Sequence, residues 1–137
     1  MTYSLQISCS KDRLKEIREF VSDVLIRHSY PDVESNKIIL AVDEICANLI
    51  IHSNNCDPQE TLKLQIDYQD RQMMIFEIED HGHGFNFNSY HEPEINELIK
   101  AKKKGGVGLL LVKRIMDEIE FVQKGNKNVC RLIKKLT

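Results

Sequence analysis

The sequence predicts an α+β fold, a single two-layer sandwich in which helices cover one face of a mixed, mostly antiparallel sheet. Three observations lead to this prediction. Apolar and polar residues alternate in several short segments, as they do in strands with one buried face. Pairs of these segments are joined by tight turns, which is typical of antiparallel hairpins and argues against a doubly wound parallel sheet. Other segments have the apolar spacing of amphipathic helices.

Length and composition limit the possible functions. The chain has 137 residues, enough for one domain but too few for a two-lobed protein kinase or a barrel enzyme. The net charge of -2 gives no strong attraction to nucleic acid or a membrane, and no apolar run approaches the roughly 20 residues of a membrane span. The four cysteines show no CxxC pairing, so we expect reduced thiols in a cytoplasmic protein.

We expect residues 1–137 to form one domain whose elements follow the hydrophobic pattern. Ser10 can cap the first helix, and a Tyr-Pro-Asp sequence at residues 30–32 separates the first helix from the second. The expected elements are a strand over residues 3–7, helices over 11–28 and 35–52, strands over 62–68 and 74–80, a helix over 108–116, and strands over 119–124 and 128–136.

The regular pattern fails between residues 84 and 108. Polar residues and a proline open this segment, a short helix is expected from Pro93 to Lys102, and two glycines close the segment. More than 20 residues without firm structure are unusual in so small a domain. The segment is therefore expected to be a functional lid at about residues 85–107.

Glu44 and Asn48 lie four residues apart on the second expected helix and therefore share one face. A carboxylate and an amide so placed can present a general base and a metal-coordinating oxygen to one site. Mg²⁺ needs few protein oxygens, so one asparagine can suffice. The alternative is that both residues face solvent. The neighbouring residues, however, are apolar nearly all round, and polar groups in such surroundings need partners.

Asp80 ends the third expected strand, in phase with Phe76 and Ile78, so its carboxylate is expected on the buried face. An unpaired carboxylate is costly there, and a ligand donor such as an exocyclic amine would satisfy it. Gly82 and Gly84 permit positive φ and a close approach of the backbone to a ligand. The alternative is a turn in which Asp80 caps backbone amides.

Two further features come after this strand. His81 and His83 are better explained as loop residues than as a metal site, because no third ligand stands at a diagnostic spacing. A glycine-rich turn then opens a helix, where free N–H groups and the helix dipole favour phosphate. It is not a Walker loop, since no Lys-Ser/Thr pair follows Gly108. The lysines at 102–104 add positive charge, or alternatively form a solvated helix face.

The three groups occur in the order Glu44-x3-Asn48, Asp80-x-Gly82-x-Gly84 and Gly106-x-Gly108-Leu109. This order resembles the N, G1 and G2 boxes of the Bergerat ATP-binding fold, whose superfamily includes DNA gyrase, heat-shock chaperones, sensor histidine kinases and mismatch-repair ATPases. The resemblance covers about residues 3–136. Within the superfamily, segments 40–52, 79–85 and 105–117 are most similar to the bacterial anti-sigma-factor serine/threonine kinases. Residues 125–128 depart from the glycine- or threonine-rich turn of many relatives.

The resemblance implies a role for each of these residues, with ATP and Mg²⁺ as cofactors. Glu44 would be the general base, Asn48 would bind both Mg²⁺ and nucleotide, and Asp80 would accept from the adenine amino group. Gly82 and Gly84 would let the lid start close to the nucleotide. The phosphates would be bound by Lys104, Gly105, Gly106, Val107, Gly108 and Leu109.

The resemblance also implies a function, that of an ATP-dependent serine/threonine protein kinase acting as an anti-sigma factor in a partner-switching system. Its substrate would be a STAS-type anti-sigma-factor antagonist, its other partner a sigma factor, and its assembly a homodimer. No nucleic acid or membrane is expected as a direct partner. The main alternative is a nucleotide-gated regulatory binding module without phosphotransfer. A detached histidine-kinase catalytic domain and a nucleotide-free structural domain are more remote alternatives.

Overall fold

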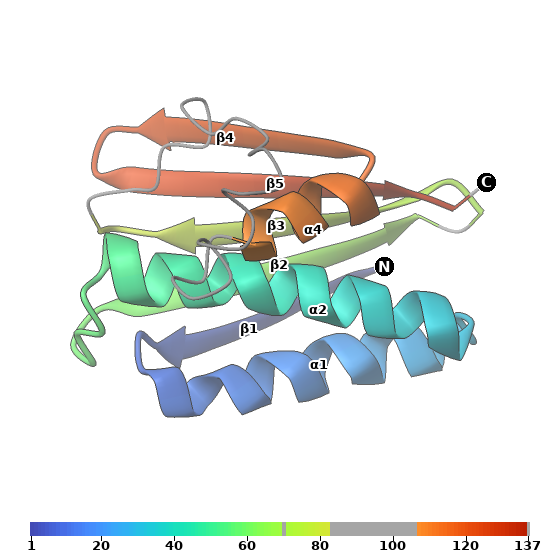
Figure 1. Cartoon of the computed structure of the whole chain (residues 1–137), viewed down its shortest axis with the longest axis horizontal. Helices are drawn as coiled ribbons and strands as arrows, with labels where there is room; N and C mark the ends of the chain where they lie inside the picture. The colour runs from blue at the N-terminus through green and yellow to red at the C-terminus, as the bar shows by residue number, and fades with distance from the viewer. Residues whose placement is uncertain (70, 83–106, 137) are drawn as a thin grey trace.

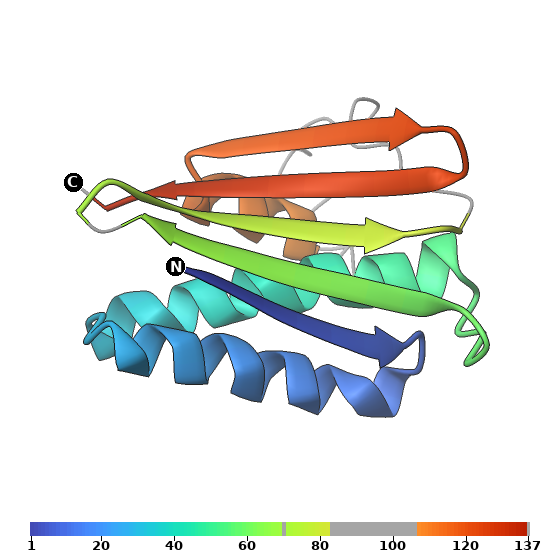
Figure 2. The same ribbon diagram turned by 180° about the vertical axis from the view of Figure 1, so that it is seen from behind.

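The computed structural model describes residues 1–69, 71–82 and 107–136. These residues form two layers, a five-stranded sheet and a layer of helices packed on one of its faces (Figure 1). Figure 2 shows the opposite face, which none of the described helices covers. The α+β class and the two-layer arrangement expected from the sequence are confirmed.

The order of the elements along the chain is also the expected one. The elements are β1 (Thr2–Ser8), the 3₁₀ helix η1 (Lys11–Arg13), α1 (Leu14–Arg27), α2 (Asp32–Asn48), the π-helical turn η2 (Leu49–Ser53), β2 (Thr61–Gln69), β3 (Met73–Asp80), α4 (Val107–Ile115), β4 (Glu118–Lys124) and β5 (Lys127–Lys135). The helix expected over residues 93–102 lies outside the described residues.

Two details at the helix ends differ from expectation. The second helix begins at Asp32, because Asp32 and Glu34 in its first turn interact favourably with the positive end of the helix dipole. Ser10 does not cap a backbone amide. Its hydroxyl instead donates to the carboxylate of Asp12, and the chain passes through a 3₁₀ turn before α1 begins.

The strands lie in the order β1-β2-β3-β5-β4, and every neighbouring pair is antiparallel. The register places Asp80 of β3 opposite Asn128 of β5. Alternate side chains of β2 and β3 are buried under the helices, including Leu64 and Phe76. Burying one such large apolar side chain stabilises the fold by about 1.5–3 kcal/mol.

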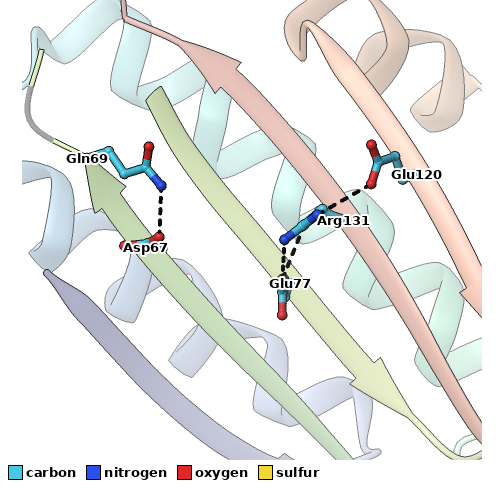
Figure 3. A network of polar contacts seen from close by, with 5 residues as sticks. All are labelled: Asp67, Gln69, Glu77, Glu120 and Arg131. Carbon is cyan, nitrogen blue, oxygen red and sulfur yellow. Dashed lines mark hydrogen bonds and ion pairs between the residues drawn. The ribbon is translucent and has the colours of Figure 1, made fainter. Parts of the chain in front are cut away.

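The uncovered face of the sheet carries charged side chains. Arg131 of β5 bridges Glu77 of β3 and Glu120 of β4, at 3.0 Å from Nη2 to Oε1 of Glu77 and 3.6 Å from Nη1 to Oε2 of Glu120 (Figure 3). Gln69 donates to Asp67 on β2 at 3.1 Å. Such half-exposed ion pairs contribute up to about 1 kcal/mol each to the free energy of unfolding. Their main effect is therefore to keep this face of the sheet polar and hydrated.

Helix α2 lies between α1 and α4 and packs against both (Figure 1). Helix α4 begins against Glu44, in the second half of α2, and its far end lies near Ile38 in the first half. Within the described ranges, none of the helices combines the length and apolar composition that crossing a bilayer requires.

Candidate functional site

Asp80, the last residue of β3, is completely buried, as its phase in the strand predicted. Its Oδ2 accepts three hydrogen bonds, from Ser53 Oγ at 2.6 Å, Asn54 Nδ2 at 3.0 Å and the Gly82 backbone N at 3.2 Å. Its Oδ1 is buried as well, and no described residue donates to it. Because a buried acceptor without a donor is costly, Oδ1 is a place where a ligand donor is expected.

Ser53 and Asn54 both reach Asp80 because the helical segment ends in the π-helical turn η2. The backbone N–H of Asn54 donates to Leu49 O, five residues earlier, at 3.0 Å. Ser53 is the last residue of η2 and Asn54 lies just past it, so the two side chains are not separated by the regular helical angle. Asn54 leaves the helix with φ -116° and ψ 1°, and its Nδ2 also donates to Leu49 O at 2.8 Å. Such π-helical turns are frequent at functional sites.

Gly82 lies directly against the end of this turn. A Cβ at Gly82 would be 2.2 Å from Ser53 O and 2.6 Å from Asn54 Oδ1, so a larger residue would displace backbone. Among the described glycines only Gly125 has a positive φ, so Gly82 is required for space and not for backbone conformation. Gly82 thus packs closely against the chain's own backbone, and its expected approach to a ligand stays a prediction.

Asn128 of β5 also contacts Gly82, through a hydrogen bond to its carbonyl oxygen. It is 1% exposed, and its Nδ2 donates to Gly82 O at 2.9 Å. Its Oδ1 is buried and finds no partner among the described residues. Ser53, Asn54 and Asn128 thus fix the backbone at the point where the expected lid would begin.

Glu44 lies half-buried on α2 and faces the beginning of α4. A Cβ at Gly108 would be 2.0 Å from Glu44 Oε2, so the carboxylate lies against the Gly108 backbone. The first turn of a helix has unpaired N–H groups and the positive end of the dipole, which favour an anion. Burial raises the pKa of the Glu44 carboxyl, and the charge of Asp43 raises it further. A raised pKa suits a general base.

Asn48 follows Glu44 by one helical turn, and its Nδ2 is buried with no partner in the described part of the chain. The side chain of Leu109 packs in the core, so only its backbone can meet a ligand. Val107 is the first residue of α4. The other expected nucleotide-binding residues lie outside the described ranges, namely Gly84, Lys104, Gly105 and Gly106.

His81, the first of the two histidines after β3, contacts the β4–β5 turn. The ring Nδ1 of His81 lies 3.3 Å from the carbonyl oxygen of Asn126. The described residues hold no group of three side chains able to bind a metal ion. His83 lies outside them.

The arrangement fits a nucleotide. The free Oδ1 of Asp80 can accept from an exocyclic amine, and the N–H groups at the start of α4 can bind phosphate. The amide of Asn48 can supply an oxygen ligand of the kind that Mg²⁺ uses beside phosphate and water.

Ser53, Asn54 and Asn128 are site residues that the sequence did not predict. A polar pair after an apolar helix looks like the start of a turn, and residues 125–128 were expected to depart from the pattern of relatives. One signal was present for Asn128. It is in phase with Cys130 and Leu132, as Asp80 is with Ile78, so alternation alone places a second polar side chain on the buried face.

Known proteins are similar to this chain in sequence and in fold. The family model described as Histidine kinase-like ATPase domain matches residues 7–134. The chain is similar to Serine-protein kinase RsbW of Halalkalibacterium halodurans, with 29% identity over 127 residues that cover 88% of this chain and 75% of the relative. It is 31% identical over 98 residues to the protein of the same name from Bacillus cereus, covering 69% of this chain and 59% of that relative. The matched region is thus less than two thirds of the Bacillus cereus protein.

Solved structures share the fold. The RsbU and RsbW domains of a Mycobacterium tuberculosis protein match with a TM-score of 0.70 and 10% identity, over 98% of this chain and 32% of that chain. The SiaB–SiaC complex from Pseudomonas aeruginosa matches with a TM-score of 0.64 and 13% identity, over 98% of this chain and 89% of that chain. The expected resemblance to the anti-sigma-factor kinases is confirmed by the RsbW relatives. The chain belongs to the histidine kinase-like ATPase domain family.

Proposed function

We propose that the protein is an ATP-dependent serine/threonine protein kinase that acts as an anti-sigma factor in a partner-switching system. The observation that carries the proposal is the contact between the half-buried Glu44 carboxylate and Gly108 at the start of α4, in a domain whose relatives are named Serine-protein kinase RsbW. It brings a carboxylate with a raised pKa to the helix end that suits phosphate.

The reaction is the transfer of the γ-phosphoryl group of ATP to a serine or threonine hydroxyl. A bond forms between the hydroxyl oxygen and the γ-phosphorus, the bond from that phosphorus to the β–γ bridging oxygen breaks, and ADP leaves. Glu44 takes the hydroxyl proton, for which it must come within hydrogen-bond reach of the substrate. The chemistry depends mainly on positioning and charge stabilisation.

The other residues bind and orient ATP. Asp80 Oδ1 accepts from the adenine amine, while Gly106, Val107, Gly108 and the Leu109 backbone bind phosphate together with Gly105 and Lys104. Asn48 would hold Mg²⁺, which neutralises phosphate charge when bound. Gly82 and Gly84 let the lid begin close to the nucleotide.

The partners are part of the same proposal. The phosphoryl acceptor is a STAS-type anti-sigma-factor antagonist, and the protein that is sequestered is a sigma factor. The relatives named Serine-protein kinase RsbW support a protein serine as the phosphoryl acceptor. We place the protein in the cytoplasm as a homodimer. The four free cysteines support a reducing compartment.

The test is to mix the purified protein with Mg·ATP and STAS-domain proteins encoded near its gene, and to map phosphoserine or phosphothreonine by mass spectrometry. Transfer by the wild type, with none by a Glu44→Ala variant that still binds ATP, supports the proposal. ATP-dependent binding of a partner without any transfer would support a nucleotide-gated binding module instead. Full transfer by Glu44→Ala would remove Glu44 from the role of base.

A further inference from the structure

We propose that Ser53 and Asn54 are positioning residues that make Asp80 selective for a nucleobase with an exocyclic amine. The inference rests on the proposed function, because it concerns the same nucleotide site. It adds two residues to that site, and it explains why two consecutive polar side chains follow an apolar helix.

The two oxygens of the Asp80 carboxylate have different surroundings. Oδ2 already accepts from Ser53 Oγ at 2.6 Å, from Asn54 Nδ2 at 3.0 Å and from the Gly82 backbone at 3.2 Å. A carboxylate oxygen has about two lone-pair directions, so three donors leave no capacity for a ligand. Oδ1 remains as the single acceptor, buried and without a partner among the described residues.

The donors also fix the direction of that acceptor. Asn54 cannot swing away from Asp80, because its Nδ2 is held at the same time by Leu49 O at 2.8 Å. The Gly82 backbone cannot retreat either, because Asn128 Nδ2 holds its carbonyl oxygen at 2.9 Å. Oδ2 of Asp80 therefore accepts hydrogen bonds from two elements, the end of η2 and the residue after β3 that precedes the expected lid. These bonds keep the carboxylate from rotating to present both oxygens to a ligand.

A single fixed acceptor distinguishes nucleobases. An exocyclic amine of the adenine type donates to it and satisfies the buried oxygen. A base with hydrogen at that ring position leaves the oxygen without a donor, and sites built to accept a hydrogen bond reject such analogues strongly. A guanine-type edge offers two adjacent donors, which a carboxylate binds best with both oxygens free. Ser53 and Asn54 remove that option by occupying Oδ2.

The experiment compares ATP with purine riboside triphosphate, which lacks the amine, by calorimetric titration of the full chain. We expect the wild type to prefer ATP at least about tenfold. Ser53→Ala should weaken ATP binding about tenfold and leave the affinity for purine riboside triphosphate within about twofold, so that the preference disappears. Ser53→Thr, which keeps the hydroxyl, should restore the preference.

Two controls separate positioning from a structural role. Ser35 is also a buried serine but its Oγ contacts Tyr30 O at 3.4 Å, far along the chain from Asp80, so Ser35→Ala should keep the preference. Asn54→Ala serves as the second variant if Ser53→Ala fails to fold, with the same expected loss of preference. A merely structural effect would lower both affinities equally.

The outcomes are distinguishable. Equal weakening of both ligands in Ser53→Ala and Asn54→Ala, or an unchanged preference in folded variants, overturns the inference and leaves the proposed function intact. A wild type that binds ATP and purine riboside triphosphate equally also overturns it. A wild type that binds neither ligand overturns the proposed function itself, and the inference with it.

Discussion

The carboxylate of Glu44 and the backbone of Gly108 are in direct contact, so closely that a methyl group on Gly108 would lie 2.0 Å from Glu44 Oε2. The contact joins the middle helix of the helical layer to the start of α4. The residue expected to remove a proton and the helix end expected to bind phosphate thus fix each other's position.

The first prediction concerns this contact. Gly108→Ala forces the flexible Glu44 side chain out of place, so we expect phosphotransfer to fall at least about tenfold, while the free energy of unfolding changes by less than about 1 kcal/mol. A radiolabel transfer assay and urea unfolding measure the two effects. The double variant Gly108→Ala with Glu44→Ala should transfer no less than Glu44→Ala alone, because both changes remove the same carboxylate from its place.

Gly125 is the matched control for that prediction. It lies in the β4–β5 turn with φ +60°, and nothing approaches its Cβ position within 4 Å. Gly125→Ala should therefore cost about 1 kcal/mol of stability through backbone strain while transfer stays at the wild-type rate. If both glycine variants lost transfer equally, the loss could not be assigned to the Glu44 contact.

The second prediction is based on the raised pKa of Glu44. Burial raises this pKa above its ordinary value of 4.5, so the folded state binds the proton more tightly than the unfolded state. Stability then falls as the pH rises from 4.5 through the raised pKa. Glu44→Gln removes this loss, and we expect the variant to be more stable than the wild type at neutral pH although it is inactive.

Urea unfolding from about pH 4 to about pH 8 tests this, because the difference between the two proteins should shrink toward acid pH. Glu19→Gln, at a largely exposed position of α1, controls for the change from carboxylate to amide. A Glu44→Gln variant less stable than the wild type at neutral pH would contradict the prediction.

The third prediction concerns the buried acceptor of Asp80. In Asp80→Asn the amide oxygen can still accept from Ser53, Asn54 and Gly82, so the fold should persist. The amide NH₂ would then replace Oδ1 and face a donor of the ligand. We expect ATP affinity to fall about 100-fold or more, measured with a fluorescent ADP analogue. Asp67→Asn, on the uncovered face of the sheet (Figure 3), should bind normally.

The fourth prediction concerns the thiols. Burial raises the pKa of Cys9 to about 11 and that of Cys130 to about 12, and raises the pKa of Cys46 well above its usual value. Only Cys56 is partly exposed among the four free cysteines. A thiol reagent at neutral pH should therefore modify one cysteine quickly and the other three only on unfolding. Cys56→Ser should remove the fast phase, and rapid labelling of more than one thiol would contradict this.

Much of the fold could be predicted because its signals are local. Apolar and polar residues alternate along the whole of β2 and β3, and apolar residues recur at helical spacing along α1 and α2. Each of these elements is therefore predicted by several residues and not by one. The burial of Asp80 could be inferred from the same alternation, because a strand side chain in phase with Phe76 and Ile78 has no other face to occupy.

The supporting residues of the site could not be found in this way. Ser53 and Asn54 reach Asp80 only because the chain forms one irregular turn. A π-helical turn has no periodic sequence pattern from which it could be predicted. The contact between Glu44 and Gly108 joins residues far apart in the chain, and a glycine gives no sign of which side chain will lie against it. The close packing of Gly82 against the Ser53 backbone is another such contact between residues far apart in the chain.

The geometry of this site depends on the number of residues in the π-helical turn at residues 49–53. Deleting one residue there would return the segment to a regular α-helix and rotate the chain beyond it by about 100°. Ser53 and Asn54 would then point in different directions even with every remaining side chain unchanged. This stretch should therefore tolerate apolar exchanges more readily than a single deletion, and a relative shorter by one residue here would need another donor for its buried aspartate.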